Sequence, residues 1–232
     1  MRLDKFLCEL GLGPRSQVKG YIRQGLVTVN GAVGTSGDQK LDETKDIVTF
    51  RGQRLIYREF YYYMLNKPKG VVSAVKDNTA GTVVELLGER KRDDIFPVGR
   101  LDKDTEGLLL LTNDGELAHR LLSPKKHVDK TYLVQAEHPF SKEDIQRLEQ
   151  GVDIGEKHIT LPARVEELAE DRILLTIHEG KFHQVKRMLQ AVDNRVLSLK
   201  RMAFGGLKLD ESLRPGEYRE LTKQEVEILH EA

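Results

Sequence analysis

Hydrophobic positions at the start of the chain follow a helical spacing. Apolar residues recur three or four positions apart, which predicts a helix over residues 1–10 with one buried stripe. These residues are Leu3, Phe6, Leu7 and Leu10. A second helix is predicted over residues 15–24, because Pro14 suits the turn before a helix and Gly25 suits its C-terminal cap.

The pattern then changes to short runs rich in β-branched residues. Residues 26–29 and 47–50 predict strands, and Asn30-Gly31 is typical of a two-residue hairpin turn. Residues 51–59 are polar and of mixed charge, which indicates a linker. The order helix, helix, hairpin, strand predicts a small α/β domain that, with its linker, spans residues 1–58.

Residues 59–232 are predicted to form a larger domain with more strands than helices. Strands are expected at 61–65, 71–74, 108–112, 131–136, 163–166, 173–178 and 196–201. Helices are expected at 116–122, 142–150, 183–192 and 223–230. Ser141 with Asp144, and Thr222 with Glu225, have the spacing of capping boxes. Because strands and helices do not alternate regularly, the pattern favours an α+β fold on a mostly antiparallel mixed sheet with flanking helices.

Composition narrows the class of protein. The 232 residues are 39% hydrophobic and 32% charged, which is typical of a soluble globular protein. No apolar run approaches the roughly 18 residues of a membrane span. A single cysteine, Cys8, rules out an internal disulfide and fits a reducing compartment. We therefore expect a cytoplasmic protein with no membrane association.

The charges are balanced overall but unevenly distributed. The 37 basic and 37 acidic residues give a net charge of zero. Residues 181–208 nevertheless hold seven basic residues and one acid, whereas residues 209–232 hold seven acids and three bases. A neutral total therefore hides a basic segment that can contact an anionic partner.

The second predicted helix carries three cations in one row. Arg15, Lys19 and Arg23 lie four positions apart, so they share a face. Such a row is a solvated surface in most helices, and in a nucleic-acid-binding protein it contacts phosphates. The segment around it resembles an S4 RNA-binding domain over about residues 1–50. The resemblance lies in Arg2-Leu3-Asp4-Lys5-Phe6-Leu7, in Ser16 to Ile22 and in Gly25-Leu26-Val27-Thr28-Val29-Asn30-Gly31.

The loop at residues 99–107 combines glycines with charged residues, and it precedes the apolar run 108–111. Gly99 permits a tight turn before Arg100 and Asp102, and Gly107 lets the chain enter the strand. A loop so placed projects polar groups from the end of a rigid element. A lone aspartate in a loop is usually a turn or cap residue, so the loop alone gives Asp102 no special role.

Longer motifs resemble the pseudouridine synthases of the RluA/RsuA type. The first is Gly99-Arg100-Leu101-Asp102, followed by Thr105 and by residues 107–115. Further matching segments follow the family order at 65–73, 130–134 and 179–188. The S4-like start joined to these motifs, together with the stretch Ser123-Pro124-Lys125-Lys126-His127 before Lys130, looks most like the RsuA group, which acts on small-subunit ribosomal RNA. The RluB, RluE and RluF groups, which act on large-subunit RNA, are close alternatives.

This resemblance implies an enzyme that isomerises uridine to pseudouridine in RNA without a cofactor or a metal. Asp102 would be the nucleophile or the electrostatic partner of the sugar, and Lys186 would keep it ionised. Many relatives have arginine at the position of Lys186, and Arg187 is a fallback. Tyr132 would stack on the uracil, accept the C5 proton, or both.

The resemblance also implies that the target base is flipped out of its stack. Arg100 would fill the gap, although an ion pair with Asp104 or Glu106 is the plainer alternative. The other residues expected to bind RNA are Arg2, Arg15, Lys19, Arg23, Lys125, Lys126, Lys130, Lys181 and Arg187. His178 and His183 flank Glu179 without the spacing of a metal site.

Two other classes of function stay open. A non-catalytic RNA-binding or ribosome-assembly factor would keep the S4-like domain but would not need Asp102, Tyr132 and Lys186 together. A small-molecule hydrolase would act on free nucleosides and would not bind RNA. The expected partner is ribosomal RNA, either naked or within a partly assembled subunit, and we expect a monomer.

Overall fold

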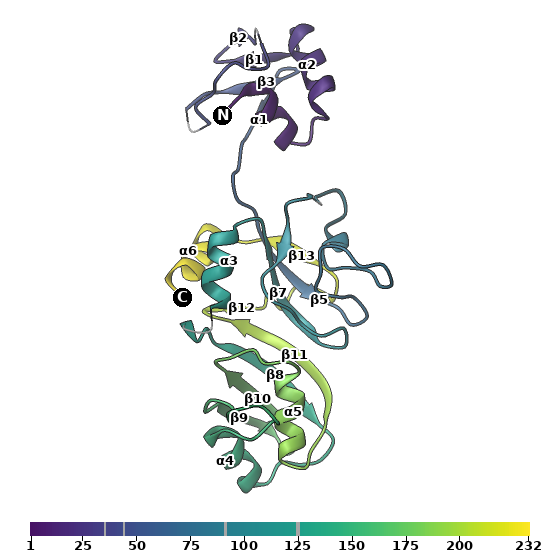
Figure 1. Cartoon of the computed structure of the whole chain (residues 1–232), viewed down its shortest axis with the longest axis vertical. Helices are drawn as coiled ribbons and strands as arrows, with labels where there is room; N and C mark the ends of the chain where they lie inside the picture. The colour runs from purple at the N-terminus through teal and green to yellow at the C-terminus, as the bar shows by residue number, and fades with distance from the viewer. Residues whose placement is uncertain (35, 44, 91, 124–125) are drawn as a thin grey trace. The chain divides into compact units, whose positions relative to one another are not determined.

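The computed structural model describes residues 1–34, 36–43, 45–90, 92–123 and 126–232. These form two compact units, Met1–Glu59 and Phe60–Ala232, each with its own elements (Figure 1). Within the described part of the chain, no helix is long and apolar enough to cross a membrane.

The first unit packs two helices against a small antiparallel sheet. The helices are α1 (Leu3–Glu9) and α2 (Arg15–Arg23). The sheet has the order β2-β1-β3-β4, formed by β1 (Val27–Val29), β2 (Ala32–Val33), β3 (Val48–Phe50) and β4 (Gln53–Leu55). Asn30 and Gly31 both have positive φ, 52° and 83°, so the predicted hairpin turn between β1 and β2 is confirmed. The buried stripe of α1 packs on Val18 and Ile22 of α2.

The prediction of a linker at 51–59 was partly wrong. Arg51 and Gly52, with φ of 50° and 79°, form a second tight turn, and β4 pairs with β3 beyond it. Two of the three residues of β4, Gln53 and Arg54, are polar and exposed, and Leu55 is half-buried. Its hydrophobic alternation is therefore too weak to appear in the sequence pattern.

The second unit is built on a nine-stranded mixed sheet, in which β7 and β11 are parallel and the other pairings are antiparallel. The main path runs β13-β5-β7-β11-β8-β10-β9, with β6 on β7 and β12 on β11. The strands are β5 (Tyr62–Lys67), β6 (Phe96–Pro97), β7 (Glu106–Thr112), β8 (Lys130–Ala136), β9 (Arg164–Ala169), β10 (Arg172–Ile177), β11 (Val196–Phe204), β12 (Leu207–Lys208) and β13 (Tyr218–Glu220). The helices are η1 (Glu85–Arg90), α3 (Gly115–Leu122), α4 (Lys142–Gln150), α5 (Gln184–Ala191) and α6 (Lys223–Glu231). The predicted α+β class and mostly antiparallel sheet are confirmed.

Helices cover both faces of this sheet, which explains the continuous apolar run in β7. Leu108 and Leu110 face the cluster that contains α3 and α6, whereas Leu109 and Leu111 face the cluster that contains α4 and α5. Figure 1 shows α3 beside α6 near one end of β11, and α5 over the part of the sheet that contains β8 and β10. A strand buried on both faces needs no polar alternation.

The strand predicted at 71–74 was wrong. With the residues that the structure describes, the segment forms one isolated bridge, between Val72 and Thr82, and no ladder. Its Ser73 hydroxyl is instead bonded to both backbone groups of Leu101. The segment therefore supports the loop that precedes Asp102, which a pattern of apolar residues does not reveal. The capping boxes at Ser141 and Thr222 are both confirmed.

Candidate active site

Asp102 lies in the loop between β6 and β7, and buried groups fix the backbone on both sides of it. Ser73 Oγ accepts from the amide of Leu101 at 3.0 Å and donates to the carbonyl of Leu101 at 2.8 Å. Gly99, with φ of 76°, makes the turn before it, and Gly107, with φ of 102°, makes the entry to β7. The loop is therefore held by specific contacts, so the direction of the Asp102 side chain is set by the fold.

A fully buried lysine holds the same loop from beneath. Lys67 Nζ donates to the carbonyls of Asp102 at 3.0 Å and Thr105 at 2.9 Å, and to that of Pro68 at 3.0 Å. Burial lowers the pKa of Lys67 to about 8. The sequence shows Lys67 within a family motif but gives no sign of this role, since the carbonyls are brought to it by tertiary folding.

Lys186, on α5, pairs with two carboxylates. Its Nζ lies 3.0 Å from Asp102 Oδ2 and 2.6 Å from Asp104 Oδ1. Burial alone would lower the pKa of Lys186, but its hydrogen bonds to Asp104 and Asp102 outweigh burial and raise it. The hydrogen bond from Lys186 in turn lowers the pKa of Asp104. The expected contact between Lys186 and Asp102 is present, whereas the contact with Asp104 was not expected.

His183 is a further neighbour of Asp102 to which the sequence pattern assigns no role. Its Nε2 lies 3.5 Å from Asp102 Oδ1. It precedes α5 with φ of 50°, and its ring stacks on that of Phe182 with centroids 3.8 Å apart. The spacing of His183 and Lys186 in the sequence could have indicated that His183 lies near Asp102. His183 is three residues before Lys186, so both lie at the start of one helix and reach the same carboxylate.

A cavity of about 740 Å³ brings the predicted catalytic residues together. Asp102, Tyr132 and Lys186 all line it, as does Arg100. Tyr132 comes from β8 and is only 8% exposed. A volume of this size is within the usual range for small-molecule and cofactor sites. The arrangement presents one carboxylate, held between an ammonium and an imidazole, to a space with an aromatic wall.

Arg100 is exposed at this cavity. Its side chain makes no ion pair or hydrogen bond with the residues that the structure describes. The two acids that could have held it have other partners, since Asp104 pairs with Lys186 and Glu106 with Lys69 at 3.6 Å. The plainer alternative, an ion pair of Arg100 with either acid, is therefore not observed.

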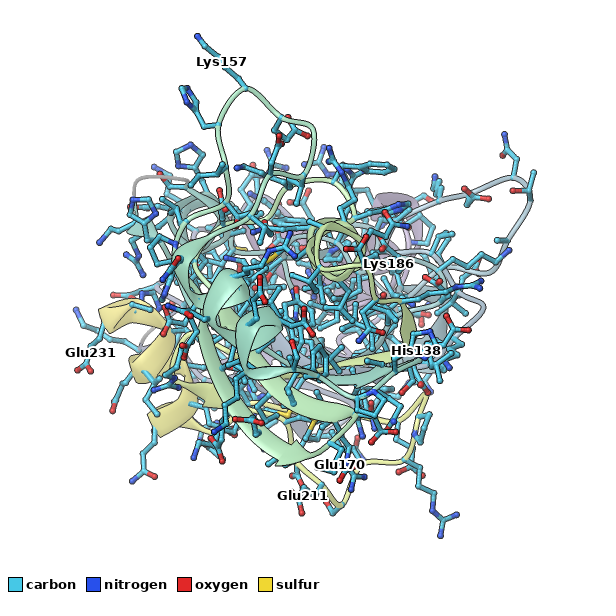
Figure 2. All side chains as sticks on the ribbon, turned by 90° about the horizontal axis from the view of Figure 1, so that it is seen from below. His138, Lys157, Glu170, Lys186, Glu211 and Glu231 are labelled. Carbon is cyan, nitrogen blue, oxygen red and sulfur yellow. The ribbon has the colours of Figure 1, made fainter. Side chains whose placement is uncertain are left out.

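Arg187 is not the alternative partner of Asp102. Its guanidinium donates to Glu156 at 2.9 Å and to the carbonyls of Phe182 and Ile154. These contacts tether the loop that carries Lys157, which points away from the body of the second unit (Figure 2). Adjacent residues of a helix do not share a face, so Arg187 binds this loop while Lys186, labelled in the same view, pairs with Asp102.

Other cations expected to bind RNA have different surroundings. Lys181 lines the cavity and pairs with Glu179 at 3.1 Å. Lys130 also lines it, half-buried, and donates to the carbonyl of Val128 at 2.6 Å. Lys126 is exposed. Lys125 lies outside the described residues.

In the first unit, the predicted row on α2 is exposed. Arg15, Lys19 and Arg23 all face solvent, and the Nε of Arg23 donates to the carbonyl of Lys19 at 3.4 Å. Arg2 differs, because its guanidinium binds the buried Asp4 through two hydrogen bonds of 3.0 and 2.8 Å. Arg2 therefore has a structural contact within the unit.

No group of three or more His, Cys, Asp or Glu side chains in the described part of the chain could hold a metal ion.

Comparison with known proteins identifies the class to which this fold and this cavity belong. Residues 61–191 match the family model of RNA pseudouridylate synthases, and residues 1–48 match that of the S4 domain. The chain therefore belongs to the RNA pseudouridylate synthase family, carries an N-terminal S4 domain and is an RNA pseudouridine synthase.

Individual relatives match along the whole chain. An "Uncharacterized RNA pseudouridine synthase YtzG" of Bacillus subtilis is 51% identical, over 100% of this chain and 99% of that protein. A "Ribosomal small subunit pseudouridine synthase A" of Vibrio cholerae is 44% identical over 97% of this chain and 98% of that protein. A solved structure described as that of a pseudouridylate synthase is 42% identical, covers 99% of both chains and superposes with a TM-score of 0.71.

Proposed function

We propose that this enzyme converts one uridine of small-subunit ribosomal RNA to pseudouridine, with Asp102 at the reacting centre. The observation that carries the proposal is the pairing of Asp102 with Lys186 at 3.0 Å in a cavity also lined by Tyr132. The Lys186 ammonium offsets the cost of placing the Asp102 carboxylate in the cavity, where it can serve as a nucleophile or as the electrostatic partner of a developing cation.

The reaction needs three events, and the cavity holds a candidate group for the first and for the last. The bond between uracil N1 and the sugar breaks while Asp102 attacks or stabilises the sugar. The detached uracil, which keeps the bonding electron pair on N1, then turns and bonds to the sugar through its C5 atom; where Asp102 has attacked, its bond to the sugar breaks in this step. The C5 proton finally leaves, either to Tyr132 or to water with Tyr132 only stacking on the ring, and N1 takes up a proton. Atoms balance without an oxidant, a reductant or a second substrate.

Arg100 has the role of a gap-filling cation in this proposal. Removing the base from its stack costs a few kcal/mol, which contacts to the RNA must offset. Arg100 is exposed at the cavity that holds Asp102 and has no protein partner among the described residues. It is therefore free to occupy the space that the base leaves or to bind a phosphate beside it.

The choice of small-subunit RNA rests on relatives. Proteins of Vibrio cholerae and Escherichia coli that are 44% and 42% identical to this chain bear the name ribosomal small subunit pseudouridine synthase A. The similarity extends over the S4 domain as well as the catalytic unit, so it includes the surface expected to select the RNA.

Mapping pseudouridines in ribosomal RNA tests this function. We expect a strain that lacks the gene to lose one pseudouridine of its small-subunit RNA. The wild-type gene should restore it, and the Asp102→Asn variant, expressed at the same level, should not. Loss of a large-subunit position instead would overturn the choice of target. No lost position in either RNA would overturn the proposed activity on ribosomal RNA.

A further inference from the structure

Arg201 is a buried cation in the wall of the cavity, and the proposed reaction does not use it. It is 2% exposed and lies on β11, directly opposite Tyr132 of β8 in the antiparallel pairing. Its Nε donates to the carbonyl of Leu108 at 2.7 Å, but its buried Nη2 has no hydrogen-bond partner among the residues that the structure describes. A buried donor left unpaired is costly, so it marks a place where a ligand can supply the acceptor.

Lys130 joins Arg201 at the same place. Both side chains lie against the ring of Phe204, with the Lys130 ammonium 5.6 Å and the Arg201 guanidinium 5.1 Å from its centroid. Both residues line the cavity. Burial, together with repulsion by Arg201, lowers the pKa of Lys130 to about 8. The two cations are thus close enough to repel each other.

Neither cation has a carboxylate partner among the described residues. The acid beside Lys130 in sequence, Asp129, is bound to His178 Nδ1 at 2.6 Å. Another acid of the cavity wall, Glu179, pairs with Lys181 at 3.1 Å. A buried and a half-buried positive charge that lack a carboxylate partner among the described residues are unfavourable side by side, and an anion bound between them would offset that cost.

We propose that Lys130 and Arg201 form a phosphate-binding site in the cavity wall, which holds a backbone phosphate of the RNA next to the target uridine. The proposal rests on the proposed function for the identity of the ligand. A phosphodiester carries one negative charge and two free oxygens, so it can accept from the ammonium and from the guanidinium together. Because Arg201 lies opposite Tyr132, a phosphate held there would lie beside the proposed stacking residue.

The first test uses inorganic phosphate as the probe and needs no catalysis. Phosphate is titrated at constant ionic strength into the full chain carrying ¹³C-labelled lysine, and the Lys130 side-chain signal is followed by NMR. We expect a saturable shift that is lost in Arg201→Gln and kept in the matched control Arg172→Gln, an exposed arginine of β10. No saturable shift in the wild type, or the same shift in Arg201→Gln, would overturn the proposal.

The second test uses RNA and separates binding from chemistry. Because a phosphate contact binds substrate and transition state alike, Lys130→Gln should raise KM about fivefold or more and leave kcat within about threefold. Lys142→Gln, on the exposed surface of α4, should change neither. A fall in kcat with KM unchanged would contradict a phosphate site. Lys130→Gln also keeps the test valid if Arg201→Gln does not fold.

The two tests separate this inference from the proposed function. Phosphate binding at Lys130 and Arg201 with no isomerisation would leave the site in place and overturn the function. Isomerisation without phosphate binding would support the proposed function and overturn the phosphate site.

Discussion

Asp102 shares its cation with a second carboxylate. Lys186 is closer to Asp104, at 2.6 Å, than to Asp102, at 3.0 Å, yet the Asp104 side chain is 69% exposed and the Asp102 side chain 31%. Water screens the more exposed pair, so the contact with Asp102 carries more of the electrostatic benefit than the distances alone indicate. His183 adds a neighbour on the other oxygen of Asp102.

The residues of this site differ in how far the sequence predicts them. Asp102, Tyr132 and Lys186 stand in motifs, so their sequence context is enough to single them out. Lys67 is singled out by its hydrogen bonds to backbone carbonyls, and Arg201 by a buried Nη2 that has no hydrogen-bond partner among the described residues. Both features exist only after folding. His183 was partly predictable. Its spacing of three residues from Lys186 is visible in the sequence, but its contact with Asp102 is not.

Lys67 should act on catalysis through position. In Lys67→Met the carbonyls of Asp102 and Thr105 lose their donor, so the loop loosens. We expect kcat to fall about 10²-fold, since small displacements of a reacting group have such effects. The free energy of unfolding should fall by about 1–3 kcal/mol for the unpaired carbonyls. Steady-state kinetics and urea unfolding measure the two effects.

The matched control is Lys69→Met. Lys69 is half-exposed and pairs with Glu106 across 3.6 Å, so its loss should cost less than about 1 kcal/mol and leave kcat unchanged. Equal effects of the two variants would contradict a positioning role for Lys67.

At the scale of elements, the parallel contact of β7 with β11 joins the two parts of the catalytic sheet. It rests on the pairing of Glu106 with Lys200 and of Gly107 with Arg201. The backbones approach so closely there that a Cβ on Gly107 would lie 2.3 Å from the carbonyl oxygen of Arg201. Gly107 therefore serves both the turn after the Asp102 loop and the sheet contact that orients Arg201.

Gly107→Ala should disrupt the parallel pairing of β7 with β11. The new methyl group overlaps backbone atoms and φ is 102°, so we expect a loss of at least about 3 kcal/mol in the free energy of unfolding. Gly115→Ala, at the start of α3 with open space around its Cβ, should stay within about 1 kcal/mol of the wild type. Urea unfolding compares the two variants. A Gly107→Ala protein as stable as Gly115→Ala would show that the backbones can separate there at no cost.

Elements with a strong hydrophobic pattern were predictable, and those defined by polar contacts were not. The run at 108–111 correctly indicated β7, and the capping boxes correctly marked the starts of α4 and α6. The apolar segment at 71–74 indicated a strand but is held by the Ser73 hydroxyl. The polar strand β4 went unnoticed because pairing with β3, not burial, forms it.

At the scale of the whole molecule, the cavity that holds Asp102 and the exposed row on α2 belong to different units. All residues that line the cavity lie within Phe60–Ala232, whereas Arg15, Lys19 and Arg23 lie within Met1–Glu59. With the roles proposed for these residues, RNA binding and chemistry should therefore be separable by mutation. The sequence could indicate both units from their motifs, but not the particular RNA structure they select.

Replacement of the three α2 cations by glutamine should weaken RNA binding without slowing chemistry. Each phosphate contact contributes about 0.7–0.9 to the slope of log affinity against log salt, so with one contact for each of the three cations the slope should fall by about 2–3. The rate of isomerisation at saturating RNA should not change. A control with Lys142, Arg172 and Lys223 replaced, three exposed cations of the second unit, removes the same charge. An equal change of slope in the control would show that only net charge matters.

Release of tritium from ribosomal RNA labelled at uridine C5 tests the central claim most directly, because this hydrogen leaves only when the new carbon–carbon bond forms. The purified Asp102→Asn variant should release tritium at least about 10³-fold more slowly than the wild type, while its affinity for the RNA stays within about threefold. Asp93→Asn, which changes an exposed aspartate of the same unit, should keep the wild-type rate. Release by Asp102→Asn at the wild-type rate would contradict the account.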